Sequence, residues 1–198
     1  EDTFRYGNEV LQRPAPPWPD RPPALPEGGA YVVMFIGSNE PGRRWPLENF
    51  IAVAKRVLDA GLRVVFVGGP QEAHAKPALA EIGHPGLIDA IGSLKLGQTV
   101  DVMKRAACVV GNDSGPGHLA IGVGAPTVLL AGGGHFGCFV PYPDEVRPAK
   151  ARFLSRPMDC YHCLWRCPKR RSDRDSFPCV AEIAPDAVWA TVRELTGI

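Results

Sequence analysis

Short apolar segments alternate with longer amphipathic segments through most of this chain, from residue 31 to its end. The apolar segments end at glycine or polar residues and therefore predict strands. They lie at 31–37, 63–69, 86–92, 107–112, 126–132 and 151–155. The other segments repeat apolar residues at helical spacing. They predict helices at 46–61, 72–82, 97–106, 115–124 and 184–197, of which 72–82 contains Pro77.

The helix predicted at 46–61 has a signal at each end. Pro46 suits the first position of a helix, and Gly61 suits the position after its last turn. Helices that alternate with such strands indicate βαβ units in a mostly parallel sheet. We therefore predict an α/β fold, with a Rossmann-like parallel sheet and helices on both faces. In such a sheet ligands bind beyond the carboxyl ends of the strands, so the strand-to-helix loops form the candidate site.

Residues 1–30 differ from the rest and contain seven of the 21 prolines. Proline fixes φ and removes a backbone donor, so we predict a stiff linker or arm here and one domain at 31–198. The chain opens on Glu1, Asp2 and Thr3, without the basic and apolar start of a signal peptide. The lack of an initiator methionine suggests processing, removal of a tag, or a fragment.

Overall composition is that of an ordinary soluble domain, with 45% hydrophobic and 22% charged residues. The formal net charge is +1, so no overall attraction to nucleic acid is expected. No apolar stretch reaches the roughly 18 residues that span a bilayer. We expect a cytoplasmic protein with no nucleic-acid partner and at most peripheral membrane contact.

The first two strand-to-helix loops carry groups that suit a nucleotide. The loop 37–46 contains Ser38 and Asn39, then two arginines before a helix start, where anions bind. Arg43 offers a fork of donors that matches a phosphate, although a solvated basic turn is the alternative interpretation. In the second loop Glu72 is placed to accept hydrogen bonds from ribose hydroxyls. The alternative is a first-turn acid that interacts favourably with the helix dipole.

The loop after the fourth strand reads Gly-Asn-Asp-Ser-Gly-Pro-Gly-His, residues 111–118. Asp113, Ser114, Gly115 and His118 fall within about one helical turn, so their polar groups can converge. We predict that backbone N–H groups cradle a diphosphate there and that the helix dipole keeps His118 neutral and donating. A well-capped buried helix is the alternative. The dinucleotide and P-loop signatures are absent, so neither of those sites is predicted.

Four of the six cysteines gather in a loop predicted at 158–180, with the spacing C-x2-C-x3-C-x11-C. Four thiolates can close a tetrahedral site, so we predict a structural zinc or iron ion in this insert. The predicted ligands are Cys160, Cys163, Cys167 and Cys179. His162 is a substitute ligand. Unligated thiols, or disulfides in an exported protein, are the alternatives.

Three segments, in this order and spacing, resemble the C-terminal half of glycosyltransferase family 9, which contains the ADP-heptose transferases of lipopolysaccharide assembly. They are GRRWPLENFIAVAKRV, VVFVGGPQE and VVGNDSGPGHLAIGVGAPTVLLAGG. The resemblance implies the half of a GT-B fold that holds the nucleotide-sugar donor. The donor contacts that it implies are Ser38, Asn39, Arg43, Glu72, Asp113, Ser114, Gly115 and His118.

The resemblance also implies a role for each contact. Arg43 meets the diphosphate, Glu72 faces the ribose and Asp113 lies near the donor sugar. The further phosphate contacts are Ser114, Gly115 and His118. None of these is implied as the catalytic base. Arg43, Asp113 and His118 instead stabilise the donor or its leaving group.

By this resemblance the chain is part of an inverting transferase that binds ADP-heptose. The acceptor is a hydroxyl of a lipopolysaccharide-core glycolipid or of a protein, at the inner face of the bacterial inner membrane. An N-terminal domain, which residues 1–30 cannot supply, binds the acceptor and carries the base. Two other classes stay open: a sugar-nucleotide epimerase or hydrolase of the same fold, and a non-enzymatic module whose metal knuckle binds nucleic acid.

Overall fold

The computed structural model describes residues 29–198, so the proline-rich segment predicted at 1–30 lies almost wholly outside the described residues. Six strands form one sheet in the order β3-β2-β1-β4-β5-β6, and all neighbours are parallel. The strands are β1 (Tyr31–Phe35), β2 (Arg63–Val67), β3 (Leu87–Asp89), β4 (Cys108–Asn112), β5 (Thr127–Ala131) and β6 (Ala151–Ser155). The predicted α/β, Rossmann-like fold is confirmed.

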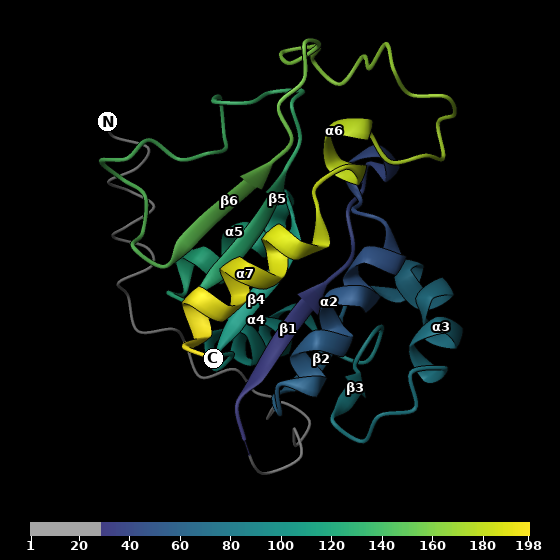
Figure 1. The fold of residues 1–198 in the computed structure, drawn as a ribbon, viewed down its shortest axis with the longest axis vertical. Helices are drawn as coiled ribbons and strands as arrows, with labels where there is room; N and C mark the ends of the chain where they lie inside the picture. Colours follow the sequence, from purple (N-terminus) through teal and green to yellow (C-terminus); the bar gives the residue numbers. More distant parts are fainter. Residues whose placement is uncertain (1–28) are drawn as a thin grey trace.

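Helices cover both faces of the sheet (Figure 1). The α-helices are α2 (Leu47–Asp59), α3 (Lys76–Ala80), α4 (Leu96–Lys104), α5 (Gly115–Gly122), α6 (Pro178–Ala181) and α7 (Pro185–Thr196). Two 3-10 helices, η1 (Pro41–Arg43) and η2 (Pro70–Ala75), follow β1 and β2. In residues 29–198 no helix has the length and apolar character that crossing a bilayer requires.

The core consists of two main layers, one on each face of the sheet. On one face Met34 packs in a cluster with Phe50 of α2 and Val188 of α7. On the other face Val33 packs in a cluster with Val102 of α4 and Ala120 of α5. The side chains of neighbouring residues in β1 thus pack into layers on opposite faces of the sheet, because successive side chains of a strand point to opposite faces. All five residues of β4 and of β5 are buried, which explains why these strands are apolar except for Asn112 at the end of β4 and Thr127 at the start of β5.

Two local predictions are corrected by the structure. The segment predicted as one helix at 72–82 is split into η2 and the short α3. Pro77 lies in the first turn of α3, where its missing N–H breaks no helical bond. Pro46 is the N-cap of α2 rather than its first residue, with an extended backbone at ψ 137. Gly61 does have a left-handed φ of 83 after α2, as predicted.

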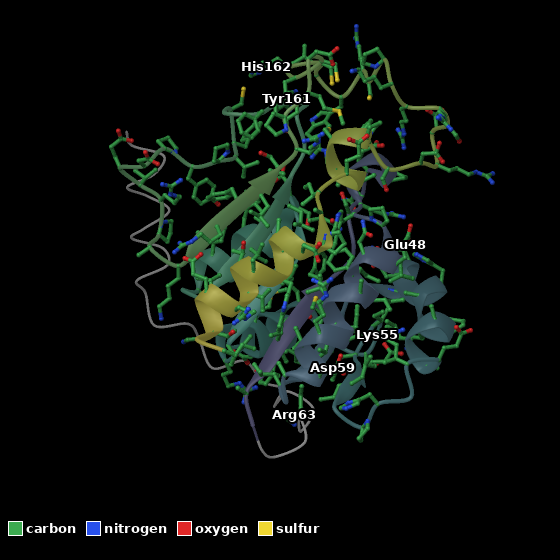
Figure 2. All side chains as sticks on the ribbon, in the orientation of Figure 1. Glu48, Lys55, Asp59, Arg63, Tyr161 and His162 are labelled. Atoms are coloured by element: carbon green, nitrogen blue, oxygen red, sulfur yellow. The ribbon has the colours of Figure 1, made fainter. Side chains whose placement is uncertain are left out.

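The cysteine-rich insert lies beyond the carboxyl ends of the strands, and Figure 2 shows Tyr161 and His162 at that end of the molecule. It packs on the glycines that follow β5. The N–H of His162 donates to the Gly133 carbonyl at 2.8 Å, and the N–H of Leu164 donates to the Gly134 carbonyl at 3.0 Å. The insert therefore borders the edge of the sheet where ligands bind.

Candidate functional site

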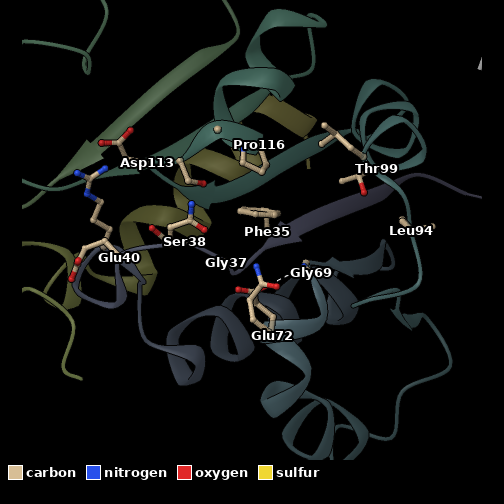
Figure 3. Close-up of a pocket in the computed structure, with 17 residues that line it drawn as sticks. Phe35, Gly37, Ser38, Glu40, Gly69, Glu72, Leu94, Thr99, Asp113 and Pro116 are labelled. Atoms are coloured by element: carbon tan, nitrogen blue, oxygen red, sulfur yellow. Dashed lines mark hydrogen bonds between the residues drawn. The ribbon is translucent and has the colours of Figure 1, made fainter. Parts of the chain in front are cut away.

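The loops after β1, β2 and β4 surround a cavity of about 600 Å³ at the carboxyl edge of the sheet. This volume is in the range of small-molecule sites. Figure 3 shows Ser38, Glu72 and Asp113 around the cavity, each on a different loop. The predicted contacts that line it are Ser38, Asn39, Arg43, Glu72, Asp113, Ser114 and Gly115. The structure thus gathers these residues in one place, at the point where the strand order reverses between β1 and β4.

The floor of the cavity contains the buried carboxylate of Glu72, which is only 2% exposed. Its Oε2 accepts the N–H of Gly69 at 2.8 Å, so it does act as an acid in the first turn of η2. The carboxylate also fills the space left by Gly37, because a Cβ there would lie 2.9 Å from Oε1. Glu72 therefore joins the loops after β1 and β2. Its contact with a ribose stays a prediction.

The Asn112 side chain fixes the loop after β1 against β4. It is fully buried, and its Oδ1 accepts the N–H of Trp45 at 2.8 Å. Its Nδ2 donates to the carbonyls of Ile36 at 2.8 Å and Gly37 at 3.3 Å. Asparagine just before a helix is often a cap, whereas Asn112 connects the end of β4 to the loop after β1.

The N-terminus of α5 opens toward the cavity without a side-chain cap. Ser114 is the N-cap residue, but its Oγ donates to the Asn112 carbonyl at 3.2 Å rather than capping the helix. A Cβ on Gly115 would meet nothing within 4 Å, so the space in front of it is open. Gly117, by contrast, is needed for packing, since a Cβ there would lie 2.3 Å from Leu129. The interpretation as a capped helix is therefore wrong, and the end of α5 is suited to an anion.

A second, smaller cavity of about 200 Å³ adjoins the first and shares Arg43, Asp113, Ser114 and Gly115 with it. His118, the remaining predicted contact, lines this smaller cavity instead. The other lining residues are His135, Phe139 and Trp165. The two cavities therefore meet at the start of α5.

A chain of hydrogen bonds links Tyr142, His118 and Asp113. The Nε2 of His118 lies 3.2 Å from Asp113 Oδ1, and its Nδ1 lies 2.6 Å from the Tyr142 hydroxyl. A carboxylate only accepts, so Nε2 carries the hydrogen toward Asp113 and, in the neutral ring, Nδ1 accepts from Tyr142. Burial, and then the charge of Asp113, raises the pKa of Tyr142, which keeps this hydroxyl protonated. The partners of His118 in the structure are thus Asp113 and Tyr142, and its predicted contact with a diphosphate stays a prediction.

Arg43 lies at the junction and lines both cavities. Its guanidinium carbon is 4.0 Å from the centre of the Trp165 ring, and its Nε is buried with no hydrogen-bond partner among the described residues 29–198. The adjacent Arg44 has a different function, because its Nε donates to the Ser38 carbonyl at 2.8 Å. Of the two arginines in this loop, Arg43 is thus the one that lines the two cavities, and its contact with a phosphate stays a prediction.

Sequence reasoning missed several residues that line the cavities. His135 and Phe139 follow β5, Trp165 comes from the insert, and Leu94 and Thr99 follow β3. The loops after β3 and β5 begin at the same edge of the sheet as the loops after β1, β2 and β4. Ligands bind beyond the carboxyl ends of the strands, so examining the loop after every strand would have identified the four residues that follow β3 and β5. Trp165 has no such signal.

The four cysteines predicted as metal ligands are near one another and form no disulfide. Burial, followed by the other three cysteines, raises the pKa of the Cys179 thiol, whose sulfur accepts the N–H of Gly133 at 3.3 Å. Within residues 29–198, however, no three His, Cys, Asp or Glu side chains are close enough to hold one ion. The two other cysteines lie outside the insert: Cys108 is buried in β4, where burial raises its pKa to about 12, and Cys138 is exposed.

Comparison with known protein families matches residues 17–158, most of the chain, to glycosyltransferase family 9 (heptosyltransferase). The chain belongs to glycosyltransferase family 9. A relative within the curated proteins is lipooligosaccharide heptosyltransferase 2 of Haemophilus influenzae, 29% identical over 107 residues. These residues are 51% of this chain and 31% of that protein. The resemblance that the three sequence segments indicated is therefore confirmed.

Solved structures of heptosyltransferases share the fold. E. coli ADP-heptose lps heptosyltransferase II matches with a TM-score of 0.67 and 21% identity, over 99% of this chain and 51% of that one. The dodecameric iron-containing heptosyltransferase TibC of E. coli, in complex with ADP-D-β-D-heptose, matches with a TM-score of 0.62 and 18% identity, over 85% and 46%. This chain spans less than a third of the H. influenzae relative and about half of these structures.

Proposed function

We propose that this chain is the domain of a heptosyltransferase that binds the donor ADP-heptose. The observation that carries the proposal is the pair of adjoining cavities that meet at Arg43 and the start of α5. The larger cavity has room for a nucleoside, the junction offers positive charge and free N–H groups to a diphosphate, and the smaller cavity takes the sugar. The TibC complex with ADP-D-β-D-heptose supports this choice of ligand.

In the proposed reaction an acceptor hydroxyl attacks the anomeric carbon of the donor. The bond from that carbon to the diphosphate oxygen breaks, and ADP leaves with the electron pair. The acceptor proton passes to a base on the acceptor-binding half of the enzyme. Arg43 and the N-terminus of α5 stabilise the charge that develops on the leaving diphosphate. The acceptor is a hydroxyl of a lipopolysaccharide core or a related acceptor.

Asp113 is the residue that we assign to the donor sugar. Its side chain is only 13% exposed, and His118 and Tyr142 hold it at the smaller cavity. A carboxylate accepts hydrogen bonds from sugar hydroxyls, whereas it repels a phosphate. Asp113 should therefore favour ADP-heptose over free ADP.

Calorimetric titration with ADP-heptose, ADP, UDP, GDP and NAD tests this function. We expect ADP to bind more tightly than UDP, GDP or NAD, and ADP-heptose more tightly than ADP. Asp113→Ala should weaken ADP-heptose binding by about 10-fold or more while ADP binding changes little. The matched control is Asp59→Ala, on the exposed face of α2 (Figure 2). Equal loss for both ligands contradicts the role of Asp113, and absence of ADP binding contradicts the proposed function.

We also propose that Cys160, Cys163, Cys167 and Cys179 bind one structural zinc or iron ion. Four unpaired thiols, one of which accepts a backbone N–H, fit such a site chemically. The iron-containing TibC supports the same assignment. The ion would further stabilise an insert in which Phe177, Cys179 and Val180 are already buried in the core. Its binding requires the four side chains to draw closer together than they are in the structure.

Metal analysis of the purified chain tests this proposal. We expect about one zinc or iron ion per chain, lost in Cys163→Ser, because a tetrahedral site with three thiolates binds more weakly. Cys138→Ser, which removes an exposed thiol outside the predicted set, is the control and should retain the ion. A chain purified without metal, or equal retention by both variants, would show that the four thiols do not form the site.

A further inference from the structure

The Arg43 side chain packs against an aromatic ring. Its guanidinium carbon lies 4.0 Å from the centre of the Trp165 ring, and its buried Nε has no hydrogen-bond partner in the part of the chain that the structure describes. Arginine side chains have many rotamers, and fixing one costs conformational entropy. An arginine that meets a diphosphate in a fixed geometry therefore needs support from a neighbouring group. Trp165 is the neighbour that the structure provides at the junction of the two cavities.

The Trp165 indole is itself fixed by contacts on several sides. Its Nε1–H donates to His135 Nδ1 at 3.0 Å, and its ring stacks on Phe177 with centroids 5.4 Å apart. Because an indole N–H can only donate, neutral His135 carries its own hydrogen on Nε2. The Trp165 backbone has a left-handed φ of 64, which a residue with a side chain adopts at a cost in free energy. The strained backbone conformation thus occurs at the residue whose indole ring packs against Arg43.

The loop after β5 leaves room for the Trp165 ring. A Cβ on Gly134 would lie 2.3 Å from the ring, and one on Gly132 would lie 2.9 Å from it. Both distances are too short for real contacts, so these glycines are required for the observed position of the indole. The unusual Gly-Gly-Gly sequence after β5 thus has a physical explanation in the packing of the insert.

The insert also contacts the loop that carries Arg43. The N–H of Phe177 donates to the Gly42 carbonyl at 2.7 Å, and a Cβ on Gly42 would lie 2.5 Å from the Phe177 ring. Arg170 donates to Glu40 Oε1 at 3.1 Å. The loop 40–44 and the insert are therefore one packed unit, and a shift of the insert displaces Arg43.

From these contacts we propose that Trp165 is a positioning residue, which holds the Arg43 guanidinium toward the diphosphate of the donor by packing its indole ring against it. The role rests on the proposed function, because it takes a diphosphate as the ligand of Arg43. It makes the cysteine-rich insert part of the phosphate-binding apparatus, although the insert itself need not touch the diphosphate.

Binding of ADP and of adenosine to Trp165 variants tests this role. Trp165→Leu removes the π face, and ADP binding should weaken by about 5- to 30-fold, while adenosine binding is unchanged. Trp165→Phe keeps a ring under Arg43 and loses only the bond to His135, so its loss for ADP should stay below about threefold. Gly134→Ala displaces the indole without altering it and should resemble Trp165→Leu. Trp189→Leu, at a half-buried tryptophan on α7, is the matched control and should bind both ligands normally.

The outcomes separate this role from the proposed function. If the chain without substitutions binds no ADP, the proposed function is wrong, and the positioning role of Trp165 is then wrong as well. If the chain binds ADP but Trp165→Leu loses ADP and adenosine equally, or loses neither, the positioning role alone is overturned. Should Trp165→Leu fail to fold, Trp165→Phe decides, because equal weakening of ADP and adenosine in that variant contradicts a role confined to the diphosphate.

Discussion

Replacing Arg43 with alanine is expected to weaken ADP binding by about 10- to 100-fold and to leave adenosine binding unchanged. A hydrogen bond to a charged group contributes about 1.5 to 3 kcal/mol, and it is lost here only for the ligand that carries the diphosphate. Arg43 lines both cavities, and its Nε has no hydrogen-bond partner among residues 29–198, so its removal leaves no acceptor of this part of the chain without that donor. Titration calorimetry at one fixed salt concentration measures both affinities.

The matched control is Arg56→Ala on α2. Arg56 pairs with Asp186 at 2.6 Å, and both side chains are exposed, so its loss changes stability little and the site not at all. Arg44→Ala is a poor control, since Arg44 supports the Ser38 carbonyl. Equal losses of ADP and adenosine in Arg43→Ala would mean that Arg43 shapes the cavity rather than meeting the diphosphate.

The strands and most helices follow directly from the sequence because their determinants are local. The mainly apolar segments of β4 and β5 are buried, and Gly61 follows α2 with a left-handed φ. The loops that carry Ser38, Glu72 and Asp113 then meet because the carboxyl ends of parallel strands share one edge. The larger cavity was therefore predictable as a meeting point of loops, before any side chain was placed.

The smaller cavity was not predictable, because its walls come from residues that are distant in sequence. Trp165 reaches Arg43 through the packing of an irregular insert with left-handed residues, and no periodic pattern specifies such a path. His135 directly follows Gly132, Gly133 and Gly134, and these three glycines form a packing surface for the insert. The partners of His118 likewise depend on where Tyr142 comes to lie.

Asn112 shows how a local rule leads to the wrong role. Asparagine before a helix is a frequent cap, but this one lies at the last position of a buried strand. Its amide makes three hydrogen bonds to the backbone of 36–45, of which one is accepted and two are donated. An amide is the only side chain of this size that both donates and accepts in this way.

Asn112→Asp should therefore cost about 3 to 5 kcal/mol of the free energy of unfolding near neutral pH. The carboxylate still accepts from Trp45, but it faces the carbonyls of Ile36 and Gly37 with a second acceptor in place of a donor. The same displacement of the loop after β1 should weaken ADP binding. Urea unfolding followed by circular dichroism measures the loss, and titration calorimetry measures the affinity.

The pH dependence separates this mechanism from a general loss of packing. The introduced carboxyl is buried among carbonyls, so its pKa in the folded chain lies above its value in the unfolded chain. The free energy of unfolding of Asn112→Asp should therefore fall as the pH rises above the pKa that the introduced carboxyl has in the unfolded chain. The loss should become smaller toward about pH 4, where the protonated carboxyl can donate to the Ile36 carbonyl.

Two control variants accompany this measurement. Asn112→Ala should lose about 2 to 4 kcal/mol of the free energy of unfolding without this pH dependence. Asn49→Asp, in the first turn of α2 with one long bond of 3.4 Å, is the control and should change stability by under about 0.5 kcal/mol. A loss in Asn112→Asp that is equal at both pH values would contradict the proposed cause.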